Sequence, residues 1–168
     1  MKKIIGNIIF VILCFAVFFG VQITFAPAIV SGESMLPTYQ DHDLVMGIKL
    51  DKTYERGDIV IVDTTNYEIG TQYIIKRVVG LPGDTVAVKD GYLYINDKRQ
   101  EESYISEKMN DDFETITVSQ GCVFVMGDNR NNSIDSRFIG EIKQTDIYAK
   151  VIFENDFVSL ISHKIFGK

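Results

Sequence analysis

Hydrophobic and polar positions divide the chain into two unlike parts. No charged residue and no histidine occurs from Ile4 to Gly32, whereas the remainder mixes apolar and polar positions throughout. The apolar run 4–30 exceeds the about 20 residues that a hydrocarbon core requires, and it therefore predicts a transmembrane helix. Ala26-Pro27-Ala28 also resembles the cleavage site of a secretory signal, but the apolar region of such a signal usually has only about 7–15 residues. We therefore expect residues 4–30 to be an uncleaved anchor.

The charges that flank the apolar run predict its orientation. Lys2 and Lys3 precede it, and no basic cluster follows it directly. Because positive charges favour the cytoplasmic side, we expect residues 1–3 in the cytoplasm and the remaining domain outside the cell membrane. The anchor is single-pass, and the lipid bilayer is an expected partner.

Beyond the anchor, short runs rich in Val, Ile and aromatic residues alternate with turn signals. This pattern predicts a mainly β domain over residues 31–156, an antiparallel barrel-like sandwich. Asp90-Gly91 is the strongest hairpin signal, because a two-residue type I′ turn needs a positive φ at both positions. The expected strands are 43–49, 58–62, 73–79, 85–89, 92–95, 115–118, 122–126 and 147–153.

Two segments stand outside this strand pattern. Residues 101–114 are acidic and polar, which predicts an exposed excursion within a small inserted cap at about 96–118. In the tail 157–168, the apolar residues recur at helical spacing. We expect an amphipathic tail that packs on the domain or lies on the membrane surface.

Composition excludes some classes of function. With 17 Lys and Arg against 23 Asp and Glu, the net charge is −6, which argues against a protein that binds nucleic acid. A content of 11% aromatic residues argues against a disordered chain. Neither cysteine has a partner at metal-ligand spacing, and we expect no metal or organic cofactor.

Ser34 and Lys76 are the first candidates for chemistry. Ser34 lies in a loop between Gly32 and Pro37, where a lone serine is usually only a turn residue. Lys76 stands inside an apolar β run, and burial would lower the pKa of its amine. A neutral amine can take a proton from a serine hydroxyl. Strand alternation puts Lys76 and Arg77 on opposite faces, so only one of them enters a given pocket. The alternative is an edge-strand lysine that faces solvent.

The segment from Gly127 to Arg137 is rich in small and amide residues, which is typical of a polar surface loop. Asp135 and Arg137 are alternate residues, and an ion pair between them could brace this loop. Such bracing would hold Ser133 where its hydroxyl could hydrogen-bond and orient an amine.

Together these blocks resemble the bacterial type I signal peptidases, the membrane-bound Ser/Lys endopeptidases that remove signal peptides. The resemblance implies that Ser34 is the nucleophile and Lys76 the general base. It also implies that Ser133 orients the amine while Asp135 and Arg137 support the loop. The blocks occur in the family's order after an N-terminal span: Ser34-Met35-Leu36-Pro37-Thr38, Arg56-Gly57-Asp58-Ile59-Val60, Lys76 to Asp84 and Gly127 to Arg137.

The same resemblance implies a β catalytic core with an inserted cap, an oxyanion hole and a substrate. The substrate is a preprotein with small side chains at the first and third positions before the cleaved bond. The backbone N–H of Ser34 would stabilise the oxyanion. Many Gram-negative members place a hydroxyl two residues before the nucleophile, but this chain has Gly32 there, which offers only backbone. The expected substrate-binding residues are Ala28, Val30, Gly32, Met35 and Ile75.

Three other functions compete with this interpretation. A Ser-His-Asp triad could use His42 or His163, although His42 between Asp41 and Asp43 more simply marks a turn. A membrane-tethered binding module would have lost Ser34 or Lys76, and both are present. A self-cleaving repressor-type Ser/Lys protein would carry a DNA-binding domain where this chain has its apolar run.

Overall fold

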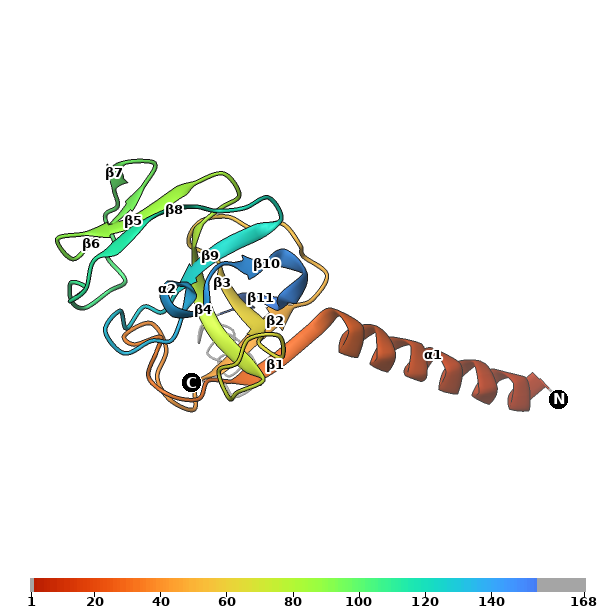
Figure 1. Ribbon diagram of the computed structural model, residues 1–168. Coiled ribbons are helices and arrows are strands. Elements are labelled where there is room, and N and C mark those ends of the chain that lie inside the picture. The colour runs from red at the N-terminus through yellow and green to blue at the C-terminus, as the bar shows by residue number, and fades with distance from the viewer. Residues whose placement is uncertain (1, 154–168) are drawn as a thin grey trace.

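The computed structural model describes residues 2–153, and it consists of one long helix joined to a β body (Figure 1). Helix α1 (Lys2–Thr24) projects away from the strands as a separate rod. Its segment Ile5–Thr24 has a mean hydropathy of 2.3 and is long and apolar enough to cross a membrane. The expected tail 157–168, and residues 154–156 of the expected β domain, lie outside the described residues.

The helix is shorter than the predicted anchor of residues 4–30. It ends at Thr24, and Phe25–Ile29 form strand β1, which pairs antiparallel with β2 (Leu44–Ile48). Pro27 disfavours helical backbone in the residue before it. Lys49 fixes the helix end, since its backbone N–H donates to the Thr24 carbonyl (2.9 Å) and its Nζ to the Gln22 carbonyl (2.9 Å). The β body therefore begins at residue 25 and not at residue 31.

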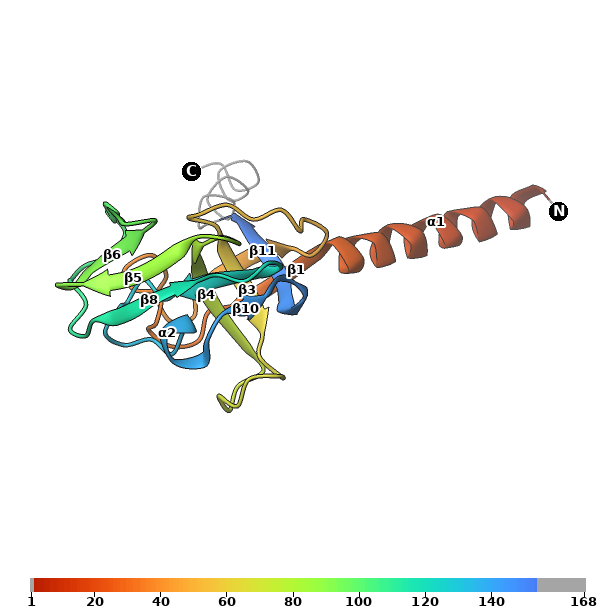
Figure 2. The same ribbon diagram turned by 45° about the horizontal axis from the view of Figure 1, so that its top comes forward.

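Two antiparallel sheets make up this body (Figures 1 and 2). The larger has seven strands in the order β1-β2-β11-β3-β4-β9-β10, and the smaller has four in the order β7-β6-β5-β8. The remaining strands of the larger sheet are β3 (Ile59–Asp63), β4 (Tyr73–Gly80), β9 (Cys122–Met126), β10 (Ile142–Lys143) and β11 (Ile147–Phe153). The smaller sheet contains β5 (Thr85–Lys89), β6 (Tyr92–Ile95), β7 (Lys98–Arg99) and β8 (Phe113–Thr117), and the short helices are α2 (Ser136–Ile139) and a 3₁₀ turn (Gln144–Asp146).

The predicted mainly β fold is confirmed, and so are most of its strands. Asp90 and Gly91 have φ values of 52° and 80°, as the predicted type I′ hairpin between β5 and β6 requires. The strand expected at 115–118 begins earlier, at Phe113. Strands β1, β7 and β10 were not predicted, because two of them have only two residues and β1 continues the apolar run of the helix.

The smaller sheet is an insertion between two strands that are neighbours in the larger one. β4 pairs with β9, and all four strands of the smaller sheet lie between them in the sequence. The inserted part is therefore larger than the predicted 96–118, since it already begins at β5. At the junction, Gly80 lets the sheets approach closely: a Cβ on it would lie 2.7 Å from Val86 Cγ2.

Candidate active site

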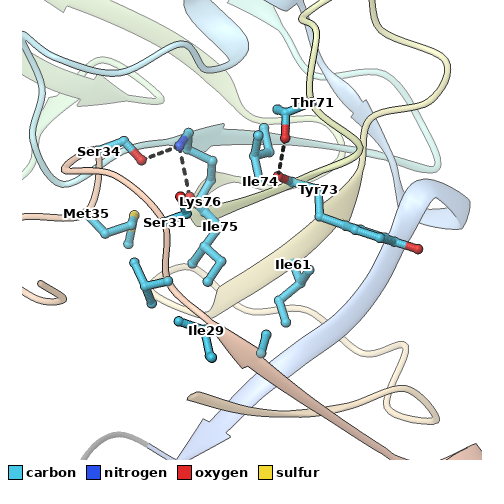
Figure 3. Close-up of a pocket in the computed structure, with 12 residues that line it drawn as sticks. Ile29, Ser31, Ser34, Met35, Ile61, Thr71, Tyr73, Ile74, Ile75 and Lys76 are labelled. Atoms are coloured by element: carbon cyan, nitrogen blue, oxygen red, sulfur yellow. Dashed lines mark hydrogen bonds between the residues drawn. The ribbon is translucent and has the colours of Figure 1, made fainter. Parts of the chain in front are cut away.

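Ser34 and Lys76 come together although 41 residues separate them in the chain. Ser34 lies in the loop after β1, and Lys76 extends from β4 toward it (Figure 3). Lys76 Nζ is 2.7 Å from Ser34 Oγ and also donates to the Ile75 carbonyl at 2.9 Å. Lys76 is only 3% exposed. The hydroxyl and the amine therefore form a direct pair, in which the amine is shielded from bulk water and Ser34 is half-buried at the pocket wall.

Burial makes the Lys76 amine unusually acidic. It lowers the pKa of Lys76 from 10.5 to about 8, because a buried ammonium loses its hydration. The negative charges of Asp135 and Asp128 oppose this effect and raise the pKa, but they are outweighed. At pH values near 8, a large fraction of the amine is thus neutral and can accept a proton.

Arg77 points to the opposite face of β4, as strand alternation requires. Its guanidinium binds both oxygens of Asp128, through Nε to Oδ1 (2.8 Å) and Nη2 to Oδ2 (2.6 Å). Arg77 Nη1 donates to the Gly57 carbonyl (2.8 Å), and the Thr38 hydroxyl donates to Asp128. This ion pair ties the loop after Ser34 to β4 and to the loop that begins at Gly127.

The 127–137 loop is braced by the pair that the sequence suggested. Arg137 Nη2 lies 2.8 Å from Asp135 Oδ2, and Asp135 is fully buried. Asp135 also accepts a hydrogen bond from the backbone N–H of Gly127 (3.0 Å) and caps α2 through the N–H of Arg137. Arg137 in turn donates to the Arg130 carbonyl at 2.6 Å. The two charged side chains thus hold both ends of the loop.

Ser133 lies at the site but does not make the expected hydrogen bond. Its Oγ is buried and has no hydrogen-bond partner among residues 2–153, so the bond to Lys76 is not formed. Ser133 instead packs against Gly127, where a Cβ would lie 2.3 Å from Ser133 Oγ and 2.5 Å from the Ser34 carbonyl. Gly127 is therefore the point where the Ser34 and Ser133 segments meet.

The backbone N–H groups of Gly32 and Ser34 differ in their hydrogen bonding within residues 2–153. Gly32 has a φ of +90°, which favours glycine, and its N–H donates to Asp41 Oδ1 at 2.8 Å. In the described part of the chain, the N–H of Ser34 donates no hydrogen bond. His42, the triad candidate, has an 83% exposed side chain and pairs with Asp41 at 2.8 Å, while His163 lies outside residues 2–153.

A pocket of ≈ 320 Å³ opens beside the Ser34–Lys76 pair (Figure 3). Four of the five expected substrate-binding residues line it: Ala28, Val30, Met35 and Ile75. Gly32 does not. The other lining residues are Ile29, Ser31, Ser34, Ile61, Thr71, Tyr73, Ile74 and Lys76. The pocket thus lies between β1 and the first half of β4, with the Ser34 hydroxyl at its wall.

Sequence reasoning missed the residues that support the site from behind. Asp128 is one, although a carboxylate partner for Arg77 could have been expected, since a cation inside an apolar strand needs a counter-charge. Glu102 is another: its carboxylate binds the fully buried side chain of Arg130. As for metals, no group of three or more His, Cys, Asp or Glu that could hold an ion occurs within residues 2–153.

Comparison with known proteins agrees with this arrangement. A family model described as signal peptidase, peptidase S26 matches residues 2–154. The chain belongs to this family. The membership confirms the family that the sequence motifs suggested. The matched residues include both the helix and the two sheets.

Individual members of the signal peptidase family are similar over most of the β body. The chain is 42% identical to a signal peptidase I of Bacillus licheniformis over 126 residues, 67% of this chain and 66% of the relative. It is 40% identical to one of Bacillus amyloliquefaciens, also over 126 residues, 67% of this chain and 65% of the relative. The matches thus span about two thirds of these relatives.

The fold is similar to that of a solved family structure. A crystal structure of a signal peptidase I from Enterococcus faecalis V583 superimposes with a TM-score of 0.52 and 34% sequence identity. The alignment covers 60% of this chain and 97% of that chain. The shared part agrees with a mainly β body as the core of the family fold.

Proposed function

We propose that this protein is a membrane-anchored serine endopeptidase that removes signal peptides from exported preproteins. The observation that carries the proposal is the direct pair of Ser34 Oγ and the buried Lys76 Nζ, 2.7 Å apart. The lowered pKa of Lys76, about 8, supports its role as a general base. Family membership supports the substrate class.

In the proposed reaction, Ser34 Oγ attacks the carbonyl carbon of the scissile peptide bond. The neutral amine of Lys76 takes the hydroxyl proton as the new C–O bond forms, and it later returns that proton to the leaving amine. Water then hydrolyses the acyl-enzyme. The free N–H of Ser34 would donate to the oxyanion, and a donor of this kind is worth about 2.7–4 kcal/mol. The N–H of Gly32 is engaged by Asp41, so it is not the second donor in this conformation.

Two free strand edges support recognition of an extended substrate. β1 is an edge strand of the larger sheet. Within residues 2–153, the first half of β4 pairs only with β3, because β9 begins its pairing at Arg77. Both edges border the pocket. A signal-peptide segment could therefore add as a β-strand, a common mode of peptide recognition. Ala28, Val30, Met35 and Ile75 would then restrict the pocket to small side chains.

The helix supports a location at the membrane surface. Ser34 follows the end of α1 by ten residues, and strand β1 leads directly from the helix into the pocket. With Lys2 and Lys3 on the cytoplasmic side, the β body would lie outside, close to the outer leaflet. A signal peptide that is still in the bilayer would present its cleavage site at this level.

The test is cleavage of a model preprotein by the detergent-solubilised full chain. Ser34→Ala, Lys76→Ala and Lys76→Arg should each fold and lose cleavage by about 10²–10⁴-fold or more. Ser34→Ala removes the nucleophile and Lys76→Ala removes the base. Lys76→Arg fails because a guanidinium stays protonated. Lys89→Arg is the matched control on an exposed lysine of β5 and should retain full activity. The pair His42→Gln and His163→Gln should also retain activity. An active Lys76→Arg variant, or an inactive histidine variant, would contradict the proposal.

A further inference from the structure

The segment 101–112, called the strap below, connects β7 with β8 and contains most of the acidic run expected to be exposed. Most of its residues are exposed, but Glu102, Tyr104, Ile105 and Met109 are not. Met109 joins the core between the sheets at 4% exposure, and the side chain of Glu102 is also 4% exposed. Tyr104 is half-buried beside Glu102. The strap is therefore fixed to the body at specific points.

The central contact is a buried ion pair between Glu102 and Arg130. The carboxylate accepts two hydrogen bonds from the guanidinium, at 2.6 and 2.7 Å, and a third from the Tyr104 hydroxyl at 2.7 Å. The Arg130 side chain is 0% exposed. Each charge has lost its hydration, so each depends on the other to remain buried.

Arg130 connects Glu102 with the 127–137 loop through hydrogen bonds. Its Nε donates to the Gly127 carbonyl at 3.0 Å, and its own carbonyl accepts a hydrogen bond from Arg137 at 2.6 Å. Gly127 is the residue whose Cα lies against both Ser133 Oγ and the Ser34 carbonyl. A guanidinium held from the strap therefore sets the position of the segment that contacts Ser34.

Two further contacts join the strap to the same region. Asn131 and the strap exchange two hydrogen bonds, one to the Lys108 carbonyl and one from the Asn110 N–H, both 2.9 Å. The guanidinium of Arg77 stacks on the Tyr104 ring, 4.1 Å from its centroid. The strap thus contacts the 127–137 loop on one side and the residue next to Lys76 on the other.

We propose that Glu102 is a positioning residue for cleavage, which acts through Arg130 to hold the 127–137 loop against the Ser34 loop. The inference rests on the proposed function for its kinetic part. It assigns a role to the part inserted between β4 and β9, because the strap belongs to this part and brings the Glu102 carboxylate to Arg130.

The experiment compares Glu102→Gln with Glu101→Gln in the full-length protein. These are neighbouring glutamates, and the side chain of Glu101 is 90% exposed. Glu102→Gln should lower kcat by about 10- to 100-fold with KM nearly unchanged, because the pocket is intact but the reacting groups are misplaced. Glu101→Gln should match the wild type. Glu102→Asp keeps the charge and should recover part of the lost kcat.

A second measurement does not depend on activity. Hydrogen exchange should accelerate about tenfold at the Asn129 and Asn132 amides, which donate to Ser34 and Asn129 carbonyls, and remain unchanged in β3 and β4. Equal acceleration in all strands would mean a general loss of stability and would overturn the inference. So would unchanged exchange in the loop.

A double variant tests the route through Arg130. If Glu102 acts through this residue, adding Glu102→Gln to Arg130→Met should lower kcat by no more than about twofold further. Multiplied effects would overturn the proposed route. The proposed function fails separately, if Ser34→Ala retains cleavage.

Discussion

Lys76 and Arg77 are adjacent on β4, yet the groups that contact their buried side chains differ between the two faces of this strand. Arg77 meets a carboxylate that binds it through two hydrogen bonds, and a carbonyl takes a third N–H. Lys76 contacts a hydroxyl and a carbonyl, and no carboxylate among residues 2–153 contacts it directly. One charge is therefore compensated at short range, whereas the other is not.

The difference separates a structural cation from a chemical one. A compensated guanidinium remains charged and fixes the loops around it. An amine without a direct counter-charge loses its proton readily, as the lowered pKa of Lys76 indicates. Burial has the largest effect on the Lys76 pKa, and the charges of Asp135 and Asp128 oppose it only in part. A guanidinium keeps its proton in proteins whatever its partner, so the identity of the side chain and the ion pair together make Arg77 structural.

The largest expected change in stability is on the Arg77 face. Arg77→Met leaves the fully buried Asp128 side chain without its guanidinium, which should lower the free energy of unfolding by about 3–5 kcal/mol. Urea denaturation in detergent, followed by circular dichroism, measures this loss. The double variant Arg77→Met with Asp128→Leu should recover most of it. If the double variant is as unstable as the single one, lost packing and not an unpaired charge is the cause.

On the Lys76 face the same substitution should have the opposite sign. The pKa of Lys76 is lowered from 10.5 to about 8, so the protonated amine destabilises the folded state relative to the unfolded chain by a free energy of the order of 3 kcal/mol. This cost is fully present below pH 8 and disappears as the pH rises through 10.5. Lys76→Met should therefore raise the unfolding free energy at pH 7 while it abolishes cleavage.

Lys89→Met is the control for that gain, because Lys89 is exposed and its replacement should change stability by less than about 0.5 kcal/mol. A Lys76→Met protein that is less stable than the wild type at pH 7 would refute the idea that Lys76 is held in an unfavourable environment. The expected gain should also shrink when denaturation is repeated at pH 10.

Some contacts of the site could be predicted from the sequence, and others could not. The opposite orientation of Lys76 and Arg77 follows from the period of a strand, and the motifs placed Ser34 and Lys76 in one site. The pairing of Glu102 with Arg130 could not be predicted, because no local pattern selects one glutamate among several for an arginine 28 positions away. An acidic run therefore suggested solvent exposure, and Glu102 departs from it.

The end of the helix was missed for a related reason. Hydropathy does not change at Thr24, since β1 is as apolar as the helix before it. The boundary depends on β2, which provides backbone partners for Phe25–Ile29, and on Lys49, which binds the last carbonyls of the helix. These partners are distant in sequence, so composition alone extends the helix too far.

The effect most specific to the Lys76 face is the dependence of cleavage on pH. Since the pKa of Lys76 is about 8, kcat/KM should fall by about tenfold per pH unit below that value, as the amine becomes protonated. A guanidinium does not lose its proton in this pH range, so Arg77 does not contribute to the pH dependence of the rate. Asp128→Asn removes a charge that raises the Lys76 pKa, so the acid limb should move to lower pH. Rates measured on one preprotein from pH 5 to 9.5 at constant ionic strength test both points. A profile that stays flat down to pH 5 would mean that a neutral Lys76 is not the base, whatever the distance between its Nζ and Ser34 Oγ.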